Sequence, residues 1–221
     1  MPGRLLPLVT NEIYHIYNRG INRQPTFTNK RECDRAIETI KFYRFADLPL
    51  RLSKFLLLEQ KKQKETAESL AKSLVEILAF CLMPNHFHFL LRQQEDGGIA
   101  TFIGKFLNSY TRYFNTVNKR DGSLFLDQFK AVRVETDEQL VHVSRYIHLN
   151  PYTGYVIKTL DELQLYRYSS FKDYIDNDET FVTTDLILGL FKDKNLYKQF
   201  VLDQADYQRR LKDIEHLALE A

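Results

Sequence analysis

The apolar run Cys81–Leu91, CLMPNHFHFLL, constrains the fold more than any other part of the sequence. Successive side chains of a β-strand point to opposite faces of a sheet, so residues two apart share a face. The run therefore predicts a strand that carries His86 and His88 together on one face. The same strand buries Phe87 and Phe89 on the other face, so the sequence predicts a sheet with an apolar side and an imidazole pair opposite it.

Two histidines on one strand face are open to two interpretations. Neutral imidazoles held side by side on a rigid strand form a ready pair of metal ligands. The alternative is a pair of structural histidines that form hydrogen bonds beneath a loop. The short motif leaves both interpretations open until a third partner is found.

A helix with residues of chemical interest is predicted to begin after Thr136. Thr136 and Gln139 have the spacing of a capping box, and Pro151 is expected to end the helix. Tyr146 and Asn150 are then four residues apart and lie on one helix face. A phenol and a carboxamide on one face could serve as a nucleophile and a metal ligand. A packed tyrosine with an asparagine C-cap is the alternative, and for this helix taken alone it is the commoner case.

The order of the predicted elements indicates an α+β fold. We expect a ferredoxin-like β-α-β-β-α-β core, followed by the Tyr146 helix and a mostly helical C-terminal extension. Residues 10–152 are expected to form the core domain and residues 153–221 the extension. The charged segment Arg51–Ser73 is expected to extend the first helix or to insert a hairpin. Strands are expected at Glu12–Asn18, Val75–Leu82, the segment that carries His86 and His88, and Phe129–Glu135.

Composition indicates a globular protein and excludes few functions. The chain has 221 residues, 44% of them hydrophobic, and no apolar run of membrane-spanning length. Its start has no signal-peptide pattern, and Cys33 and Cys81 are expected to be free thiols in a reducing cytoplasm. The net charge of +2 is too small to indicate nucleic-acid binding, although residues 1–31 carry five basic side chains against one acidic one.

The order and spacing of several segments resemble those of the HUH-superfamily single-tyrosine transposases. The likeness is to the REP-associated tyrosine transposases, of the IS200-like transposase family, and it covers about residues 10–175. The histidine strand is similar to the metal-binding strand of that family, and the Tyr146 helix is similar to its nucleophile helix. The matching segments are Tyr14–Pro25, Met83–Leu91, Ser123–Arg133, Tyr146–Pro151 and Tyr168–Tyr174.

The resemblance implies an HUH-endonuclease fold in which the Tyr146 helix is catalytic. It implies cleavage and rejoining of single-stranded DNA at hairpin-forming repeats, with Tyr146 attacking phosphorus to form a covalent 5′-phosphotyrosine. It also implies that His86, His88 and Asn150 bind Mg²⁺ or Mn²⁺ at the scissile phosphate. Many single-tyrosine relatives carry glutamine at the position of Asn150, and the shorter asparagine keeps the oxygen donor but has less reach.

Contacts with DNA are expected at two places. Arg19, Asn22 and Arg23 lie in the turn after the first strand, where polar side chains could read unstacked bases. Lys130 and Arg133 on the last strand could neutralise backbone phosphates. Each of these residues is equally well explained as an ordinary surface residue. The expected partner is single-stranded or hairpin DNA, with no membrane, and the protein is expected to be a monomer or a homodimer.

Two other functions compete with a transposase. A sequence-specific DNA-binding protein that has lost catalysis would keep the fold but lose the histidines or the tyrosine, and both are present here. A metal-dependent phosphohydrolase with water as the nucleophile would need carboxylates or a second histidine motif in register. No second HxH pair accompanies the first, so the DNA-binding protein is the second interpretation and the hydrolase the third.

Overall fold

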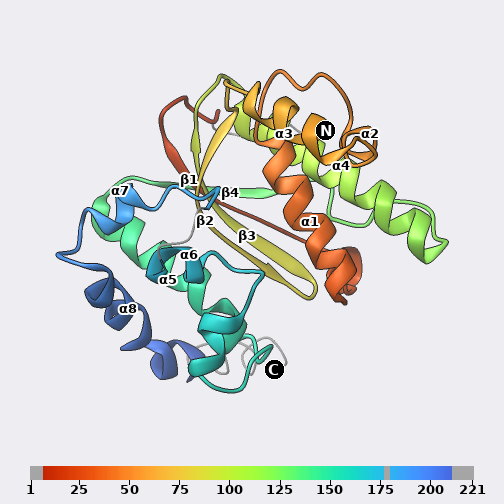
Figure 1. Cartoon of the computed structure of the whole chain (residues 1–221). Coiled ribbons are helices and arrows are strands. Elements are labelled where there is room, and N and C mark those ends of the chain that lie inside the picture. Colours follow the sequence, from red (N-terminus) through yellow and green to blue (C-terminus); the bar gives the residue numbers. More distant parts are fainter. Residues whose placement is uncertain (1–6, 177–179, 211–221) are drawn as a thin grey trace.

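The computed structural model describes residues 7–176 and 180–210 (Figure 1). The elements follow one another as β1 (Ile13–Arg19), η1 (Ile21–Arg23), α1 (Lys30–Tyr43), α2 (Leu52–Phe55), α3 (Gln60–Glu68), β2 (Val75–Met83), β3 (His86–Gln93), α4 (Gly98–Asn118), β4 (Lys130–Val134), α5 (Asp137–Thr153), η2 (Asp161–Leu165), α6 (Phe171–Ile175), α7 (Asp185–Leu188) and α8 (Lys194–Leu202). The segment Arg51–Ser73 contains the short helices α2 and α3, so it is inserted between α1 and β2 and does not extend α1.

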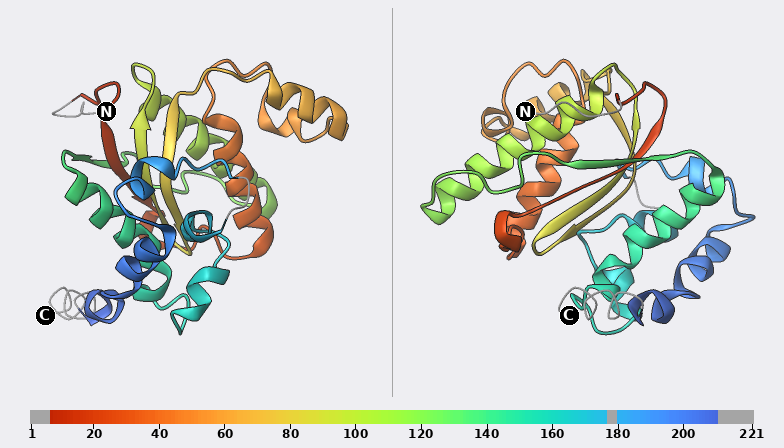
Figure 2. Two further views of the ribbon diagram at one scale, coloured as in Figure 1. Left: turned by 60° about the vertical axis from the view of Figure 1, so that its left-hand side comes forward. Right: turned by 180° about the vertical axis from the view of Figure 1, so that it is seen from behind.

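The sheet has four strands, all antiparallel to their neighbours, in the order β2-β3-β1-β4. Helix α1 joins β1 to β2, and α4 joins β3 to β4. This connectivity is the split βαβ arrangement of ferredoxin-like folds. The predicted α+β fold with its β-α-β-β-α-β core is therefore confirmed. Figure 2 shows α1 and α4 on one side of the sheet, and α5 and α8 on the other.

Side-chain caps fix where α1 and α5 begin. Asn29 accepts a hydrogen bond from the backbone N–H of Glu32 at 3.0 Å. Thr136 accepts one from the backbone N–H of Gln139 at 3.1 Å, and the Gln139 side chain accepts one from the N–H of Glu135 at 2.8 Å. These bonds satisfy backbone donors that have no partner within a helix. The helix start predicted at Thr136 is confirmed.

The prediction that Pro151 ends the helix that carries Tyr146 is wrong. Helix α5 runs on to Thr153 and closes with the N–H of Gly154 donating to the Asn150 carbonyl at 2.8 Å. A proline lacks the N–H that would bond to the carbonyl four residues earlier, and its ring crowds that carbonyl. The carbonyls of Asn150 and Pro151 still accept hydrogen bonds from the N–H groups that follow, so the last turn forms after the proline. Tyr152, expected outside the helix, consequently lies within it.

The two faces of β3 divide as the sequence predicts. Phe87 and Phe89 are fully buried, and the ring of Phe106 from α4 lies 5.3 Å from that of Phe87. Ile16 of β1 is buried with them. Removing a side chain of this size from water contributes about 1.5–3 kcal/mol. This face therefore holds the sheet to its helices, and the histidines project from the opposite face.

The C-terminal segment is joined to the sheet along the outer edge of β2. The backbone N–H of Leu82 donates to the Tyr168 carbonyl at 2.8 Å, and that of Thr183 donates to the Ile77 carbonyl at 2.9 Å. These bonds occupy groups that an edge strand would otherwise expose. Helices α6 and α8 also pack together, and α8 contacts α5. The predicted division into two domains stays a prediction.

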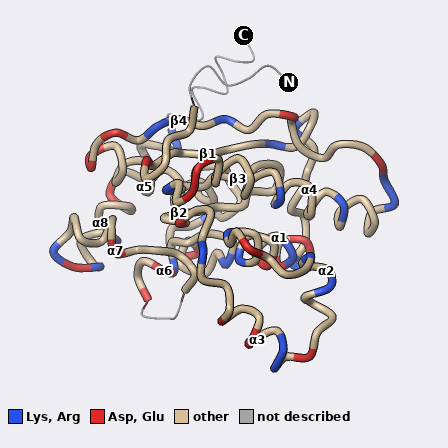
Figure 3. Tube along the Cα trace, turned by 90° about the horizontal axis from the view of Figure 1, so that it is seen from above, with Lys and Arg blue, Asp and Glu red and all other residues tan. Residues whose placement is uncertain are grey.

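Charged residues of both signs are mixed over the surface. Figure 3 shows Lys and Arg residues interspersed with Asp and Glu residues along the helices, in keeping with the net charge of +2. In the described part of the chain, no helix is long and apolar enough to cross a membrane. Cys33 and Cys81 are both free and buried, as expected.

Candidate active site

The strand β3 places the two histidines on the sheet face that α5 covers. The ring centroids of His86 and His88 are 5.1 Å apart, with the rings nearly perpendicular at 88°. His88 is buried, with 5% of its surface exposed, whereas His86 at the start of the strand is partly exposed. The pair is thus held by a central strand of the sheet and is not a mobile surface feature.

Helix α5 brings Tyr146 onto this pair. The ring centroid of Tyr146 lies 5.4 Å from that of His88, and the two rings meet edge to face at 90°. The tyrosine keeps 40% of its surface exposed, so its ring contacts the histidine on one side and reaches solvent on another. Residues from segments far apart in the sequence therefore form one cluster.

Asn150 lies one turn after Tyr146 and is fully buried. Its amide nitrogen donates a hydrogen bond to the backbone carbonyl of Tyr146 at 2.9 Å. This bond holds the amide nitrogen of the carboxamide against the backbone of its own helix. The predicted role of Asn150 as a metal ligand stays a prediction.

The imidazole pair fits a divalent cation. With metal–nitrogen bonds of about 2.1 Å, two imidazoles that share an ion have ring centroids roughly 4.5–5.2 Å apart, which includes the distance between His86 and His88. Within residues 7–176 and 180–210, no three His, Cys, Asp or Glu side chains converge on one such site. A cation held here would take further ligands from Asn150, water or a phosphate oxygen, which suits Mg²⁺ or Mn²⁺.

His15 of β1 lies against His88. The Nε2 atom of His15 is 2.9 Å from Nδ1 of His88, and its ring centroid is 5.8 Å from that of Tyr146. Burial lowers the pKa of His15 to about 4, so the imidazole is neutral at pH 7. No local sequence pattern could have identified His15, because its position depends on the strand register. In that register Tyr17 lies directly opposite His88, and His15 is two residues from Tyr17.

The other histidines of α5 lie away from the cluster. His148 is fully buried, with Nε2 2.8 Å from the Ser170 hydroxyl and Nδ1 2.7 Å from the Tyr197 hydroxyl. Burial lowers its pKa to about 3. His142 pairs with Arg145 at 2.7 Å and does not support Tyr146. His148 therefore joins α5 to the C-terminal segment and takes no part in the site.

The buried His148 predicts a loss of stability in acid. Its pKa is about 3 when folded and about 6.5 when unfolded, so the unfolded state binds the extra proton between these values. The stabilisation is complete above pH 6.5 and is lost as the pH falls toward 3. Between pH 7 and pH 5, the free energy of unfolding measured in urea should fall by about 2 kcal/mol more for the wild type than for His148→Gln. Equal losses in the two proteins would contradict this assignment.

The structure brings three of the predicted DNA contacts close to the histidines. Arg19 is exposed on β1 directly opposite His86. The following turn, with Asn22 and Arg23 in left-handed conformations, is joined to the start of β3 by the Asn85 amide, which donates to the Arg23 carbonyl at 3.3 Å. These residues therefore border the open end of the histidine face.

The two predicted contacts on β4 lie on different faces. Lys130 is exposed and opposite Tyr17, on the histidine face. Arg133 is opposite Tyr14, on the other face, and its guanidinium lies 2.7 Å from the Glu12 carboxylate. Two residues three apart on a strand must point to opposite faces, so strand alternation by itself predicts that Lys130 and Arg133 lie on different faces of the sheet. The structure thus brings Lys130, and not Arg133, to the site.

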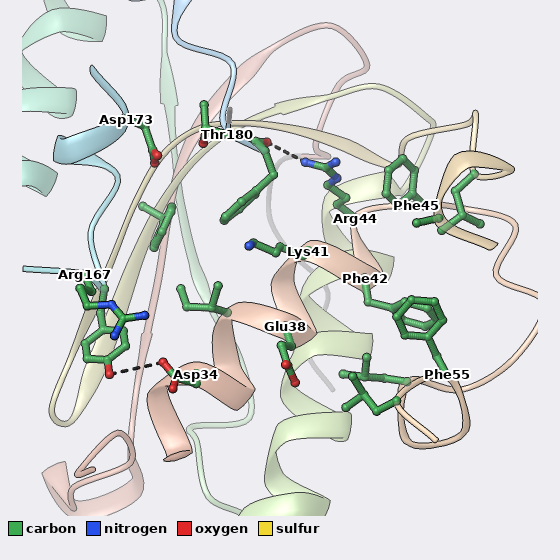
Figure 4. Close-up of a pocket in the computed structure, with 18 of the residues that line it drawn as sticks. Asp34, Glu38, Lys41, Phe42, Arg44, Phe45, Phe55, Arg167, Asp173 and Thr180 are labelled. Atoms are coloured by element: carbon green, nitrogen blue, oxygen red, sulfur yellow. Dashed lines mark hydrogen bonds between the residues drawn. The ribbon is translucent and has the colours of Figure 1, made fainter. Parts of the chain in front are cut away.

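A cleft lies elsewhere, between α1 and the C-terminal segment (Figure 4). Asp34 and Lys41 of α1, with Arg44 directly after it, line one wall, and Arg167 and Asp173 line the other. The predicted catalytic, metal and DNA residues are not among the residues that line it. The cleft is therefore separate from the cluster of histidines and tyrosine.

Comparison with protein families gives a match to Transposase IS200 like over residues 57–150. Residues 57–150 are therefore similar to the IS200-like transposases. The IS200-like segment spans less than half of the chain and includes His86, His88, Tyr146 and Asn150. The family resemblance drawn from the sequence is confirmed over this segment. The turn with Arg19, Asn22 and Arg23 precedes it.

Solved structures of transposases are also similar to the chain. One is a REP-associated tyrosine transposase bound to a REP hairpin, with 14% identity and a TM-score of 0.49 over 79% of this chain and 86% of that chain. Another is a candidate transposase from Deinococcus radiodurans R1, with 16% identity and a TM-score of 0.36 over 66% of this chain and 95% of that chain. No curated protein matches the sequence.

Proposed function

We propose that the protein is a metal-dependent transposase that cleaves and rejoins single-stranded DNA at hairpin-forming repeats through a covalent 5′-phosphotyrosine. The observation that carries the proposal is the contact between Tyr146 and His88, whose ring centroids are 5.4 Å apart. A nucleophile and a metal ligand must meet at one phosphate in this chemistry. The IS200-like segment includes both residues.

Tyr146 is the proposed nucleophile. Its phenol oxygen forms a bond to the phosphorus of the scissile phosphate while the bond from phosphorus to the 3′ oxygen breaks. The phenol loses its proton, the 3′ oxygen takes one up, and the 5′ end of the DNA remains joined to the tyrosine. The 3′-OH of a second strand then attacks the phosphotyrosine, which rejoins the DNA and releases the phenol.

The surrounding residues are proposed to make this attack possible. A phenol is a poor nucleophile at pH 7, because its ordinary pKa is about 10. His86, His88 and Asn150 would hold Mg²⁺ or Mn²⁺, which when bound neutralises charge on the scissile phosphate. Arg19 and Lys130, exposed on the same sheet face, would hold neighbouring phosphates of the strand.

The remaining proposed DNA contacts differ in how directly they can act. Asn22 and Arg23, beside the start of β3, are proposed to contact unstacked bases or nearby phosphates. Arg133 would first have to break its ion pair with Glu12, so it is the weakest of the proposed contacts.

The proposed enzyme acts in the cytoplasm, with residues 10–152 as its catalytic domain and residues 153–221 as its extension.

A covalent adduct on a denaturing gel tests the proposal. The protein is incubated with Mn²⁺ and a pool of 3′-labelled single-stranded DNA hairpins with randomised flanks. Because the 5′ phosphate of the labelled fragment joins to the protein, a transposase shifts the label to the mass of protein plus DNA. Released fragments without an adduct indicate a hydrolase. Binding without either product indicates a DNA-binding protein and contradicts the proposal.

We expect cleavage to require single-stranded or hairpin DNA. A tyrosine on a helix beside a sheet-borne histidine pair needs the phosphate drawn into the site with its neighbouring bases unstacked. Pairing opposes this by a few kcal/mol and covers the base edges. A hairpin selected from the pool and the fully paired duplex of the same sequence are compared at equal concentration. Equal rates of cleavage would rule out this view of the substrate.

A further inference from the structure

Each ring of the histidine pair is hydrogen-bonded at its Nδ1 atom. Nδ1 of His86 is 2.6 Å from Oδ1 of Asn85, and Nδ1 of His88 is 2.9 Å from Nε2 of His15. A neutral imidazole carries one hydrogen, so a partner at one ring nitrogen decides whether the other has a basic lone pair. Asn85 and His15 therefore decide whether Nε2 of His86 and Nε2 of His88 carry the lone pair that a cation needs.

The direction of the hydrogen bond between Asn85 and His86 follows from the amide. Nδ2 of Asn85 donates to the carbonyl of Arg23 at 3.3 Å, so Oδ1 is the amide atom that faces His86. A carboxamide oxygen can only accept, and Nδ1 of His86 therefore carries the hydrogen. In the neutral ring, the basic lone pair is then on Nε2.

We infer that His15 is a positioning residue that accepts the Nδ1–H of His88 and so holds the basic lone pair of His88 on Nε2. The inference rests on the proposed function in taking His88 as a metal ligand. Only one of the two tautomeric arrangements of this pair is compatible with that role. If His15 donated instead, neutral His88 would carry its hydrogen on Nε2 and could not bind a cation there.

The sheet gives this hydrogen bond a fixed geometry. In the pairing of β1 with β3, Tyr17 is directly opposite His88, so His15 is its diagonal neighbour on the same face. The rings of His15 and His88 stack at 23° with their centroids 5.1 Å apart. His15 also touches the ring of Tyr146 edge to face. One side chain therefore contacts both the proposed ligand and the proposed nucleophile.

The tautomer of His88 can be measured directly in the metal-free wild type. Long-range ¹H–¹⁵N NMR spectra distinguish a ring protonated at Nδ1 from one protonated at Nε2. We expect His15, His86 and His88 all to carry the hydrogen on Nδ1. A His88 ring with its hydrogen on Nε2 overturns the inference, whether or not the protein binds a cation. This measurement needs no substitution and does not depend on catalysis.

Mn²⁺ binding by calorimetry tests the consequence for the metal. His15→Phe keeps a flat ring but removes the acceptor, and loss of such an acceptor weakens metal affinity by about 10–100-fold. His15→Gln supplies an amide oxygen as the acceptor and should restore affinity to within about threefold of the wild type. His142→Phe, which removes an imidazole outside the cluster, should bind as the wild type does.

The outcomes separate this inference from the proposed function. If His15→Phe binds Mn²⁺ with wild-type affinity while His88→Ala does not bind it, only the inferred role of His15 is overturned. Wild-type affinity in His88→Ala, or no binding by the wild type, overturns the proposed metal site instead. If circular dichroism shows that His15→Phe is unfolded, the comparison of His15→Gln with the wild type and the NMR measurement decide the question.

Discussion

Replacing Tyr146 by phenylalanine is expected to abolish the covalent DNA adduct and to slow cleavage by at least ~10³-fold. The change removes one hydroxyl and keeps the ring that packs edge to face on His88. Folding and DNA binding should therefore change little, since the ring contacts remain. Denaturing gels of 3′-labelled hairpin DNA measure the adduct, and fluorescence anisotropy measures binding by the same variant.

Tyr207→Phe provides the matched control for this experiment. Tyr207 is 57% exposed and lies after α8, outside the cluster, so its variant should form the adduct at the wild-type rate. An adduct formed normally by Tyr146→Phe would assign the nucleophile to another tyrosine. Tyr110 is poorly suited to that role, because its hydroxyl donates to the Thr26 carbonyl and burial raises its pKa.

Replacing either His86 or His88 by alanine is expected to reduce cleavage by ~100-fold or more with both Mg²⁺ and Mn²⁺. Each change removes one of the two imidazoles proposed to hold the cation. The loss from His88→Ala should be the larger, because His88 is buried and contacts both His15 and Tyr146. Single-turnover cleavage of a labelled hairpin over a range of metal concentrations measures the effect.

A control variant and a chelator complete this experiment. His142→Ala removes an imidazole that pairs with Arg145 away from the sheet face, so its cleavage rate should match that of the wild type. Excess EDTA should stop cleavage by the wild type, and added Mn²⁺ should restore it. Cleavage that continues in EDTA would exclude a metal-assisted mechanism and would leave the histidine pair with a structural role.

The parts of the fold that were predicted correctly depend on residues close together in the sequence. The two-residue alternation of β3 assigned Phe87 and His88 to opposite faces, because successive side chains of a strand point to opposite sides of the sheet. The cap at Thr136 needs only a neighbour three residues away. Pro151 was misjudged because a proline removes a backbone donor but leaves the carbonyl acceptors that the following turn uses.

The element order, the histidine pair and the spacing of Tyr146 from Asn150 can all be predicted from local sequence patterns. The packing of α5 with Tyr146 against His88 cannot, and it is seen only in the folded chain. The same holds for the register of β1 against β3, which places His15 beside His88. The physical reason is that strand register and helix docking depend on burial summed over many distant contacts, which no local pattern specifies.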